Sequence, residues 1–525
     1  MIETGAWTPL RIPVFRMLWL AVLAGNVGTW MQTVGAQWLV VGEPGAATWV
    51  SLVQTVTMLP VLLFALPSGA LADTLDRRRL LLGVQMTLFC VATALTLLTL
   101  LDHMRPPLLL VFTFLLGCGQ ALTLPSWQAL IPEIVPHDAL PAASALGAVN
   151  TNLARSLGPA IGGLLVAHLG SAAVFALNAL SFAVFALALA LWRRPPRTPT
   201  GSPEHFGSAL RAGGRYVRYS PEIRMILARV LLFVLPGSAV WGLLPLVARD
   251  RLGMGASGYG VLLAALGAGA IAGALLMPRA RALLSTDRMI VGTGLVYGAA
   301  LAVVALVTDP FVVTAVLAAA GLAWMMLVSR MNVAMQLLLP NWVRARALAI
   351  YQLVFAGGQA AGALLWGQAA SAFGLAEAFG AASVMMLAGV LTVRVMPVHT
   401  SEEEDRTPAV FWAEPHLMLQ PHLDDGPILI SASYRVPDAN TAEFATVMEE
   451  VRWSRQRTGA TQWGLFRDGE DPAVFVEVYL VPTWAEHLRQ HRGRLTGQDE
   501  QVEERAVALA DGPPEITHLL PHKTN

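Results

Sequence analysis

The chain has 525 residues, of which 55% are hydrophobic and only 13% are charged. Because a soluble globular domain is about 25% charged, this composition excludes a purely soluble protein, and the length excludes a single domain. The net charge of zero hides two unlike regions: residues 1–398 carry 24 arginines, no lysine and 13 acidic residues, whereas residues 399–525 carry 11 basic and 22 acidic residues. Two cysteines, Cys90 and Cys118, are too few for a disulfide framework or a zinc cluster, so we expect no metal and no cofactor.

Twelve apolar segments precede residue 400, each close to the length of about 20 residues that a membrane-spanning helix needs. They run over residues 16–41, 48–72, 80–101, 107–130, 143–167, 171–192, 223–247, 257–278, 287–308, 310–336, 346–371 and 374–396. The first is too long for the apolar part of a signal peptide, so we expect it to remain as a helix. The sequence therefore predicts an all-α membrane body with twelve transmembrane helices.

Arginine positions predict how these helices cross the membrane. With the N-terminus inside the cell, nineteen arginines fall in the inside segments and three in the outside segments. Because arginine and lysine accumulate on the cytoplasmic side, we expect both termini and the C-terminal domain in the cytoplasm. The 34 arginines against one lysine suggest a bacterial genome rich in GC pairs, and hence a multi-pass protein of a bacterial inner (cytoplasmic) membrane.

The membrane body contains a repeat with an offset of 204 residues, in which Gly69 corresponds to Gly273 and Arg77 to Arg281. Duplicated halves are typical of secondary transporters, which bind substrate near the membrane midplane between the halves. The predicted regions are an N-terminal six-helix half (1–192), a cytoplasmic loop (193–222), a C-terminal six-helix half (223–398), an acidic linker (399–420) and a cytoplasmic domain (421–525).

The sequence GALADTLDRRR spans the end of the second predicted helix and the loop after it. Gly69, Asp73, Arg77 and Arg78 resemble the loop motif between the second and third helices of the major facilitator superfamily, although Thr74 stands where that family usually has arginine. The resemblance implies a conformational latch, in which the carboxylate contacts basic side chains and a helix end of the other half. A nearby cation would also offset the unfavourable helix dipole at this carboxylate. Alternatively, the arginines only anchor the cytoplasmic side.

The fifth predicted helix contains NTNLARSLGPAIGG. Gly158 and Gly162 lie on one face, where another backbone can approach closely, and Pro159 bends the helix. With Gly163, this segment resembles a signature that the superfamily shows mainly in exporters running as antiporters, which favours export. The alternative is simple helix packing.

Arg155 lies near the middle of the same helix, where a charge is costly unless it faces protein or a water-filled cavity. This position indicates that Arg155 contacts an anion or belongs to a coupling network. Alternatively, its side chain is a structural tether that bonds to backbone carbonyls. Its counterpart in the repeat is the uncharged Gln359.

Polar residues in the first helix form one stripe, comprising Asn26, Thr29, Thr33 and Gln37. Further polar positions in the predicted helices are Gln32, Gln54, Gln336, Gln352 and Gln359. Such side chains either line a substrate cavity or bond helices together. No acid lies deep in the first or fourth helix, so proton coupling is expected through Asp73, His168 or Arg155, and without a Walker A motif we expect no direct ATP drive.

The C-terminal region begins with the acidic linker sequence SEEEDR. Its periodicity predicts strands over 427–436, 461–467, 473–481 and 515–520, and helices over 438–457, 482–491 and 496–509. The order β-α-β-β-α-β is that of a ferredoxin-like α+β domain. The phrases RTGATQWGLFRD and FVEVYLVPTWAEHLRQH resemble the dimeric α+β barrel domains related to antibiotic-biosynthesis monooxygenases.

We expect one face of the sheet in this domain to lack helices and to carry Phe475, Tyr479 and Trp463. Because such an apolar face needs a partner, we expect the protein to form a homodimer through residues 421–525. His487 and His491 are four residues apart on a predicted helix, and we expect them on its solvated face. Two histidines without a third ligand make a poor metal site.

The whole chain, including FRMLWLA near its start, resembles a branch of the superfamily that contains enterobactin-type siderophore exporters and transmembrane secretion effectors. The resemblance implies a proton-coupled exporter of small organic molecules (a siderophore, drug or secondary metabolite) that works by alternating access, and not an enzyme. Its expected partners are a small-molecule substrate, protons and membrane lipids, with no nucleic acid. The alternatives are an importer, a lipid-related transporter, or a membrane-tethered monooxygenase that acts without a cofactor through the C-terminal domain.

Overall fold

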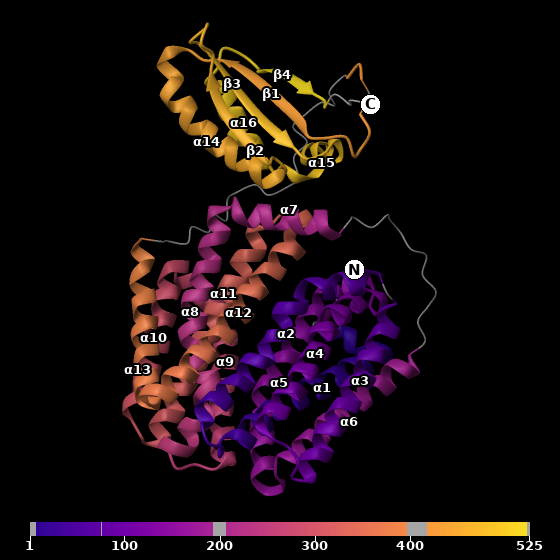
Figure 1. Cartoon of the computed structure of the whole chain (residues 1–525), viewed down its shortest axis with the longest axis vertical. Coiled ribbons are helices and arrows are strands. Elements are labelled where there is room, and N and C mark those ends of the chain that lie inside the picture. The colour runs from indigo at the N-terminus through magenta and orange to yellow at the C-terminus, as the bar shows by residue number, and fades with distance from the viewer. Residues whose placement is uncertain (1–6, 75, 193–205, 396–416, 420, 522–525) are drawn as a thin grey trace. The chain divides into compact units, whose positions relative to one another are not determined.

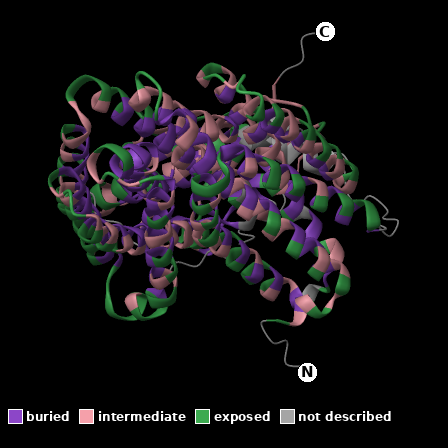
Figure 2. Ribbon diagram, turned by 90° about the horizontal axis from the view of Figure 1, so that it is seen from below, coloured by how far each residue is buried: buried purple, intermediate pink, exposed green. Residues whose placement is uncertain are grey.

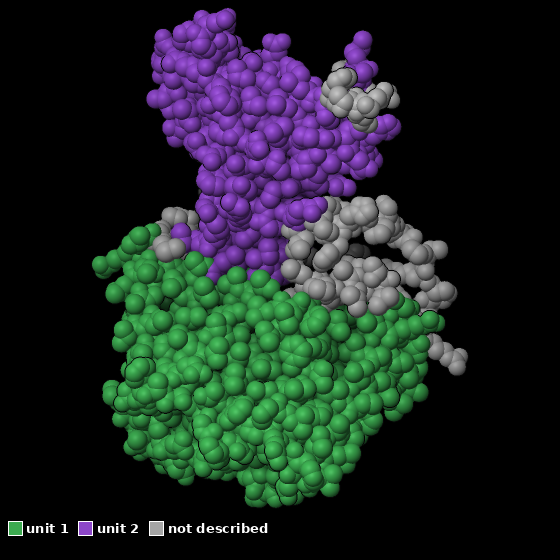
Figure 3. Space-filling view, in the orientation of Figure 1, with its two compact units in different colours: residues 1–200, 228–331, 351–398 green, residues 201–227, 332–350, 399–525 purple. Residues whose placement is uncertain are grey.

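The computed structural model describes residues 7–74, 76–192, 206–395, 417–419 and 421–521 (Figure 1). The chain divides into two compact units (Figure 3). Unit 1 comprises Met1–Thr200, Ala228–Met331 and Tyr351–Val398, and unit 2 comprises Gly201–Leu227, Asn332–Ile350 and His399–Asn525. Three boundaries between the units, at residues 227/228, 331/332 and 350/351, therefore fall inside helices α8, α11 and α12, whose bounds are given below.

Long helices make up the first 400 residues. The first half contains α1 (Pro13–Val40), α2 (Ala46–Thr74), α3 (Arg77–Leu100), α4 (Pro106–Ile134), α5 (Leu140–Leu169) and α6 (Ser171–Leu191). The second half contains α8 (Pro221–Leu246), α9 (Ala256–Leu283), α10 (Thr286–Leu306), α11 (Pro310–Leu338), α12 (Asn341–Phe373) and α13 (Leu375–Leu391). Within the described part of the chain, eleven helices are long and apolar enough to cross a membrane. Helix α5 is not among the eleven; it carries Arg155 and the polar run Asn150–Asn152.

Local sequence sets where several of these helices begin. Asp76 caps α3 by accepting a hydrogen bond from the backbone N–H of Arg79 at 2.9 Å. Pro13 starts α1, where a missing N–H costs no helical hydrogen bond. Gly170 and Gly374 precede α6 and α13 with φ of +79° and +110°, which is a conformation that glycine adopts without steric cost.

Helix pairs in unit 1 pack both within and between the halves. Helix α1 packs against α5 and α6, α2 against α4, α3 against α6, and α10 against α13, whereas the contact of α5 with α9 joins the two halves. Buried and exposed residues occupy different faces of the helices (Figure 2). Many leucines stay exposed, such as Leu187 and Leu306, as expected for faces that contact lipid.

Helix α7 (Phe206–Arg218) belongs to unit 2 and lies in the segment that the sequence predicts as a loop between the halves. It is amphipathic: Ala212, Tyr216 and Val217 are buried, whereas Arg211 and Arg218 are exposed. The 3.6-residue period of these side chains, interrupted by glycines, explains why a composition-based reading missed the helix.

The C-terminal part of unit 2 is a four-stranded antiparallel sheet with helices on one face (Figure 1). Its elements are β1 (Ile428–Arg435), α14 (Thr441–Thr458), β2 (Gln462–Arg467), β3 (Val474–Val481), α15 (Trp484–Arg489), α16 (Gly497–Ala508) and β4 (Glu515–Leu519). The strand order is β2-β3-β1-β4, and Ile430 of the central strand β1 pairs with Tyr479 and with His518.

The covered face of the sheet carries the aromatic residues, so the expectation that they lie on the open face is wrong. Phe475 and Tyr479 are 7% and 1% exposed, and Phe475 packs against Phe444 of α14 at 5.5 Å between ring centroids. Half-buried Trp463 packs against the same core. Strand β3 reads VFVEVYLV: the covered face carries Glu477 among apolar residues, whereas the open face is wholly apolar, so alternation alone could not choose the covered one. The open face carries Leu429, Ser431, Ser433, Val474, Val476, Val478, Leu480 and the exposed Phe466 and Leu519.

Candidate functional site

Helix α5 contacts helices of both halves through its small residues. A Cβ atom on Gly158 would lie 2.5 Å from Trp30 Cβ, and one on Gly162 would lie 2.9 Å from Met31 Cα, both on α1. A Cβ on Gly163 would lie 2.6 Å from the Cα of Gly260 on α9. The residues of the predicted motif in this helix, including the buried Pro159, therefore hold α5 close to two neighbouring helices.

Arg155 projects from α5 over the ring of Trp30, with its guanidinium carbon 5.7 Å from the ring centroid. Its Nε atom is buried and has no hydrogen-bond partner, while the residue as a whole is partly exposed. The predicted tether to backbone carbonyls is not seen for this side chain. By contrast, Arg78 donates to the carbonyls of Leu189 and Ala190 at 2.8 and 2.9 Å.

A chain of aromatic rings continues from Trp30 into the second half. Trp30 lies 5.9 Å from Trp241 of α8, and Trp241 lies 5.8 Å from Trp324 of α11, measured between ring centroids. The ring of Trp324 further contacts those of Phe233, Tyr297 and Phe355. The indole Nε1 of Trp241 is buried without a hydrogen-bond partner. Sequence reasoning missed these rings, because aromatic residues in apolar helices carry no periodic signal of their own.

The polar stripe predicted on α1 divides among several neighbours. Asn26 donates to Asn150 of α5 at 2.8 Å, and Thr29 accepts from Gln120 of α4 at 3.0 Å. Thr33 donates to the Thr29 carbonyl at 3.1 Å in its own helix. Gln32 points elsewhere, because its side chain accepts a hydrogen bond from Asn178 of α6. The partners Asn150, Gln120 and Asn178 lie far from α1 in the sequence and could not be found from it.

Glutamines join the two halves where α1 ends and α2 begins. Gln37 donates to the carbonyl of Trp241 at 3.1 Å and accepts from the hydroxyl of Tyr259. Gln54 donates to Gln359 at 3.3 Å. Gln37 and Trp241 are 204 residues apart, which is the offset of the internal repeat, so equivalent positions of the two halves meet here. At the same end, Arg249 donates to the carbonyl of Val41.

The predicted latch is described only in part. Gly69 and Asp73 belong to α2, but their side chains lie outside the described residues. Arg77 forms an ion pair with Glu133 of α4 at 2.9 Å. Glu133 was not predicted as a partner of Arg77, because nothing in the sequence connects it to the loop motif.

Two more of the predicted polar residues lie away from these contacts. Gln336 belongs to unit 2, is exposed, and donates to Asn332 one helical turn away at 2.5 Å. His168 is exposed in the last turn of α5.

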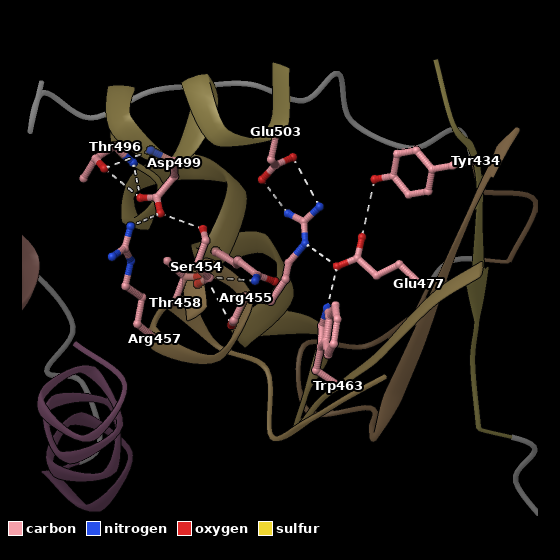
Figure 4. Close-up of polar contacts among 11 residues, drawn as sticks. Tyr434, Ser454, Arg455, Arg457, Thr458, Trp463, Glu477, Thr496, Asp499 and Glu503 are labelled. Carbon is pink, nitrogen blue, oxygen red and sulfur yellow. Dashed lines mark hydrogen bonds and ion pairs between the residues drawn. The ribbon is translucent and has the colours of Figure 1, made fainter. Parts of the chain in front are cut away.

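A buried ionic cluster lies between the sheet and helices of the C-terminal domain (Figure 4). Arg455 of α14 is 1% exposed and donates to Glu477 at 3.1 Å and to Glu503 at 2.6 and 3.2 Å. Glu477 also accepts from Trp463 Nε1 at 2.9 Å. Nearby, Asp499 accepts from Ser454 at 2.6 Å. These groups satisfy one another, as buried charges must.

Three histidines gather beside this cluster, so the expectation of a solvated helix face for His487 and His491 is wrong. They are 1% and 8% exposed, and His487 Nε2 lies 3.1 Å from His518 Nε2. Burial, then the nearby charges of His518 and Arg455, lower the pKa of His487 to about 3. Burial and His487 lower the pKa of His491 to about 2. The helix predicted over 482–491 is α15 (Trp484–Arg489), and His487 lies on its buried face, where its ring contacts those of His491 and His518. Among the described residues, no group of three or more metal-ligating side chains could hold a metal ion.

Glu486 of α15 connects the C-terminal domain to α7 within unit 2. It accepts from Arg494 at 2.7 and 3.0 Å and from Arg215 of α7 at 3.2 Å. Burial alone would raise the pKa of Glu486, but the bonds and charge of Arg494 outweigh it and lower the pKa to about 2. The guanidinium carbon of Arg494 lies 4.8 Å from the ring centroid of Trp342, near the start of α12. Charged and aromatic contacts thus attach the domain to α7 and to the start of α12, all within unit 2.

Comparisons with known proteins found a matching family and relatives that are described as transporters. A family model described as transmembrane secretion effector matches residues 4–525. The staphyloferrin A transporter of Staphylococcus aureus is 24% identical over 277 residues, covering 52% of this chain and 69% of that protein. The multidrug efflux pump Tap of Mycolicibacterium fortuitum is 28% identical over 399 residues, covering 73% and 95%. A solved bacterial homologue of the human lysosomal transporter Spinster, inward-facing and unoccupied, is 16% identical with a TM-score of 0.57, covering 74% of this chain and 95% of that one, which shows a shared fold.

Proposed function

Because this chain belongs to the transmembrane secretion effector family of major facilitator transporters, we propose that it is a secondary active exporter of small organic molecules. Its relatives include a multidrug efflux pump and a staphyloferrin A transporter, and these names support a siderophore, drug or secondary metabolite as the substrate class. We also propose that twelve helices span the membrane. The twelfth is α5, which is not among the eleven described helices that are long and apolar enough to cross a membrane.

The contacts between the halves at the α1–α2 end carry the proposed mechanism. Gln37 bonds to Trp241 and Tyr259, and Gln54 bonds to Gln359, so side chains from both halves close this end. Hydrogen bonds between membrane helices contribute about 0.6 kcal/mol each, so a few of them can break and re-form in every cycle. This supports alternating access by rocking of the two halves.

The arginine distribution supports an orientation with both termini and the C-terminal domain in the cytoplasm of a bacterial inner membrane. In that orientation, the end that is closed at Gln37 faces the outside. Proton coupling and the latch at residues 69–78 belong to the same proposal, supported by the sequence motif and by the position of Asp73 at the end of α2.

The C-terminal domain is proposed as a ferredoxin-like regulatory or dimerising module. Its strand order β2-β3-β1-β4 and its half-buried open face, with Val476, Val478 and Leu480, support association with a second copy. Its contact with α7 through Arg215 and Glu486 supports a regulatory role. A monooxygenase function has less support, because Arg455, Glu477 and Glu503 are engaged with one another.

Transport in inside-out membrane vesicles from cells that express the full chain tests the proposal. With an imposed gradient that is acid inside, labelled siderophores and drugs should accumulate, and a protonophore should abolish the accumulation. Vesicles from cells without the protein are the control. Accumulation only in right-side-out vesicles would show import instead, and accumulation that resists the protonophore would remove the proton coupling.

A further inference from the structure

Three described arginines of unit 1, Arg155, Arg229 and Arg251, have a buried Nε without a hydrogen-bond partner, and of these three Arg155 alone has no described hydrogen bond from its terminal nitrogens. Its one described interaction is with the face of Trp30, and its buried Nε atom makes no hydrogen bond. Arg229, also within a long helix, donates instead to the carbonyl of Gly389 and to Thr392. A buried donor without a partner costs about 1–3 kcal/mol, so the fold alone gives no reason for the unsatisfied guanidinium of Arg155.

A second donor without a partner lies beside the same ring. Trp241 contacts Trp30 at 5.9 Å, and its indole Nε1 is buried without a hydrogen-bond acceptor. Arg155 and Trp30 belong to the first half, whereas Trp241 belongs to the second. A ligand that accepts hydrogen bonds from both Arg155 and Trp241 would therefore touch both halves.

The charged residues around Arg155 indicate the charge that such a ligand would carry. Each acidic residue that the structure describes in unit 1 lies in a loop, a short turn, or the first or last turn of a helix. The guanidinium of Arg155 is thus not neutralised by a nearby carboxylate in the described part of unit 1, and it would attract an anion and repel a cation. A carboxylate fits best, because it can accept two parallel bonds from a guanidinium.

The tryptophan rings beside Arg155 indicate which apolar group the ligand would carry. Trp30, Trp241 and Trp324 form a chain of neighbouring rings with successive centroid distances of 5.9 and 5.8 Å, in which Trp30 and Trp241 are partly exposed and Trp324 is buried. An aromatic ring packed against Trp30 or Trp241 gains about 0.5–1.5 kcal/mol beyond the burial of its area. An aliphatic group of equal size would gain the burial without this term.

We propose, on the basis of the exporter function above, that Arg155, Trp30 and Trp241 form the substrate-recognition site, and that the substrates are organic anions with an aromatic ring, such as aryl carboxylates. The carboxylate binds Arg155 and the indole N–H of Trp241, while the ring stacks on the tryptophans. Because the site draws on both halves, the bound anion stabilises a conformation in which they approach each other.

Equilibrium binding to the full-length protein in lipid nanodiscs tests the proposal with four matched radiolabelled probes. They are 2-naphthoate, the neutral 2-naphthalenemethanol, the cationic 2-naphthylmethylammonium and the non-aromatic decahydro-2-naphthoate, which has the same carbon skeleton as 2-naphthoate. We expect 2-naphthoate to bind at least about tenfold more tightly than the neutral and cationic probes, and about two- to twelvefold more tightly than the non-aromatic acid, which lacks only the aromatic term. Arg155→Gln should remove the preference for the anion, Arg155→Lys should retain part of it, and Trp241→Phe should weaken naphthoate a few-fold while leaving naphthalenemethanol unchanged. Arg105→Gln, an exposed loop arginine, is the matched control and should change nothing.

Each outcome separates this site from the exporter function. Equal binding of anionic and neutral probes, or an unchanged preference in a correctly folded Arg155→Gln protein, overturns the site even if vesicles export other compounds. If the preference depends on Arg155 but inside-out vesicles accumulate no compound, the recognition site stands and the exporter function fails. Preferential binding of the cation would overturn the assignment of charge.

Discussion

Arg155 and Arg455 lie in two regions of the molecule, and their guanidinium groups have opposite surroundings. Arg455 of the C-terminal domain bonds to two carboxylates, Glu477 and Glu503, and its guanidinium carbon lies 5.1 Å from the ring centroid of Tyr479. Arg155 of the membrane bundle has an aromatic ring beside it and a buried donor without a partner. The difference teaches that a buried charge with matched partners maintains a fold, whereas one with unsatisfied donors is available to a ligand.

Replacing the two arginines with methionine gives the largest expected contrast. Arg455→Met leaves Glu477 and Glu503 buried without their cation, so the free energy of unfolding of the domain should fall by about 3–5 kcal/mol. Hydrogen exchange of residues 428–519 in the full-length protein measures this loss. The matched control is Arg505→Met, which removes an exposed ion pair and should cost at most about 1 kcal/mol.

The same substitution at Arg155 should leave the stability of the membrane bundle unchanged or raised, because no carboxylate loses its partner. Thermal unfolding in detergent checks this expectation. Equal losses of stability for Arg155→Met and Arg455→Met would break the comparison.

Acid should destabilise the C-terminal domain more than the membrane bundle. Burial lowers the pKa of His487 to about 3 and of His491 to about 2, so the folded domain keeps them neutral while the unfolded chain protonates them near pH 6.5. The folded state is therefore favoured above pH 6.5 and loses about 1.4 kcal/mol per pH unit for each histidine as the pH falls toward 3. Hydrogen exchange of residues 428–519, corrected for intrinsic rates, should show this slope between pH 6.5 and 5.

Substituting His487→Gln should reduce the pH dependence of the unfolding free energy by about 1.4 kcal/mol per pH unit, which is the contribution of one histidine. His422→Gln removes an exposed histidine and should leave the slope unchanged. A stability that does not depend on pH across this range would show that the histidines bind protons equally well in both states.

Asp73→Asn should reduce transport about tenfold while leaving protein abundance and thermal stability unchanged. Loss of the latch carboxylate is expected to shift the equilibrium between the two conformations by about 1.4 kcal/mol, which corresponds to tenfold. Asp76→Asn is the matched control, because asparagine caps the start of α3 as well as aspartate does. Normal transport by Asp73→Asn in inside-out vesicles would remove the latch from the mechanism.

The smallest effect is expected at the glutamine contacts between the halves. Gln54→Leu removes the hydrogen bond to Gln359 and should favour opening of that end by about 0.6 kcal/mol, a two- to threefold change. An impermeant maleimide should then label Ser51→Cys, a position that is 0% exposed in the closed state, two to three times faster in a background without the native cysteines. The exposed Gln352→Leu is the control, and equal labelling of all three proteins would show that Gln54 does not hold this end closed.

The sequence by itself determined the class of protein and the order of its elements. The apolar segments predicted helices close to those found, such as 223–247 for Pro221–Leu246, because the length of an apolar run and its flanking polar residues act locally. The strands of the C-terminal domain were placed within two residues for the same reason, since alternation along β1 and β3 is a local property. Arg155 could be singled out because a charge inside an apolar helix is unusual wherever the helix packs.

The partners of each side chain were decided only by the tertiary structure. Gln32 and Gln37 lie on the same helix, yet one bonds to Asn178 within its own half and the other to Trp241 of the opposite half. The face of strand β3 that carries Glu477 is the less apolar one, yet the packing of α14 and α16 buries it together with Phe475. His487 is buried against Trp484 and against His518 of β4, and the aromatic rings around Trp241 meet where helices distant in the sequence pack together. A sequence specifies the period of a helix or strand through neighbouring residues, whereas the partner opposite each face comes from segments hundreds of residues away.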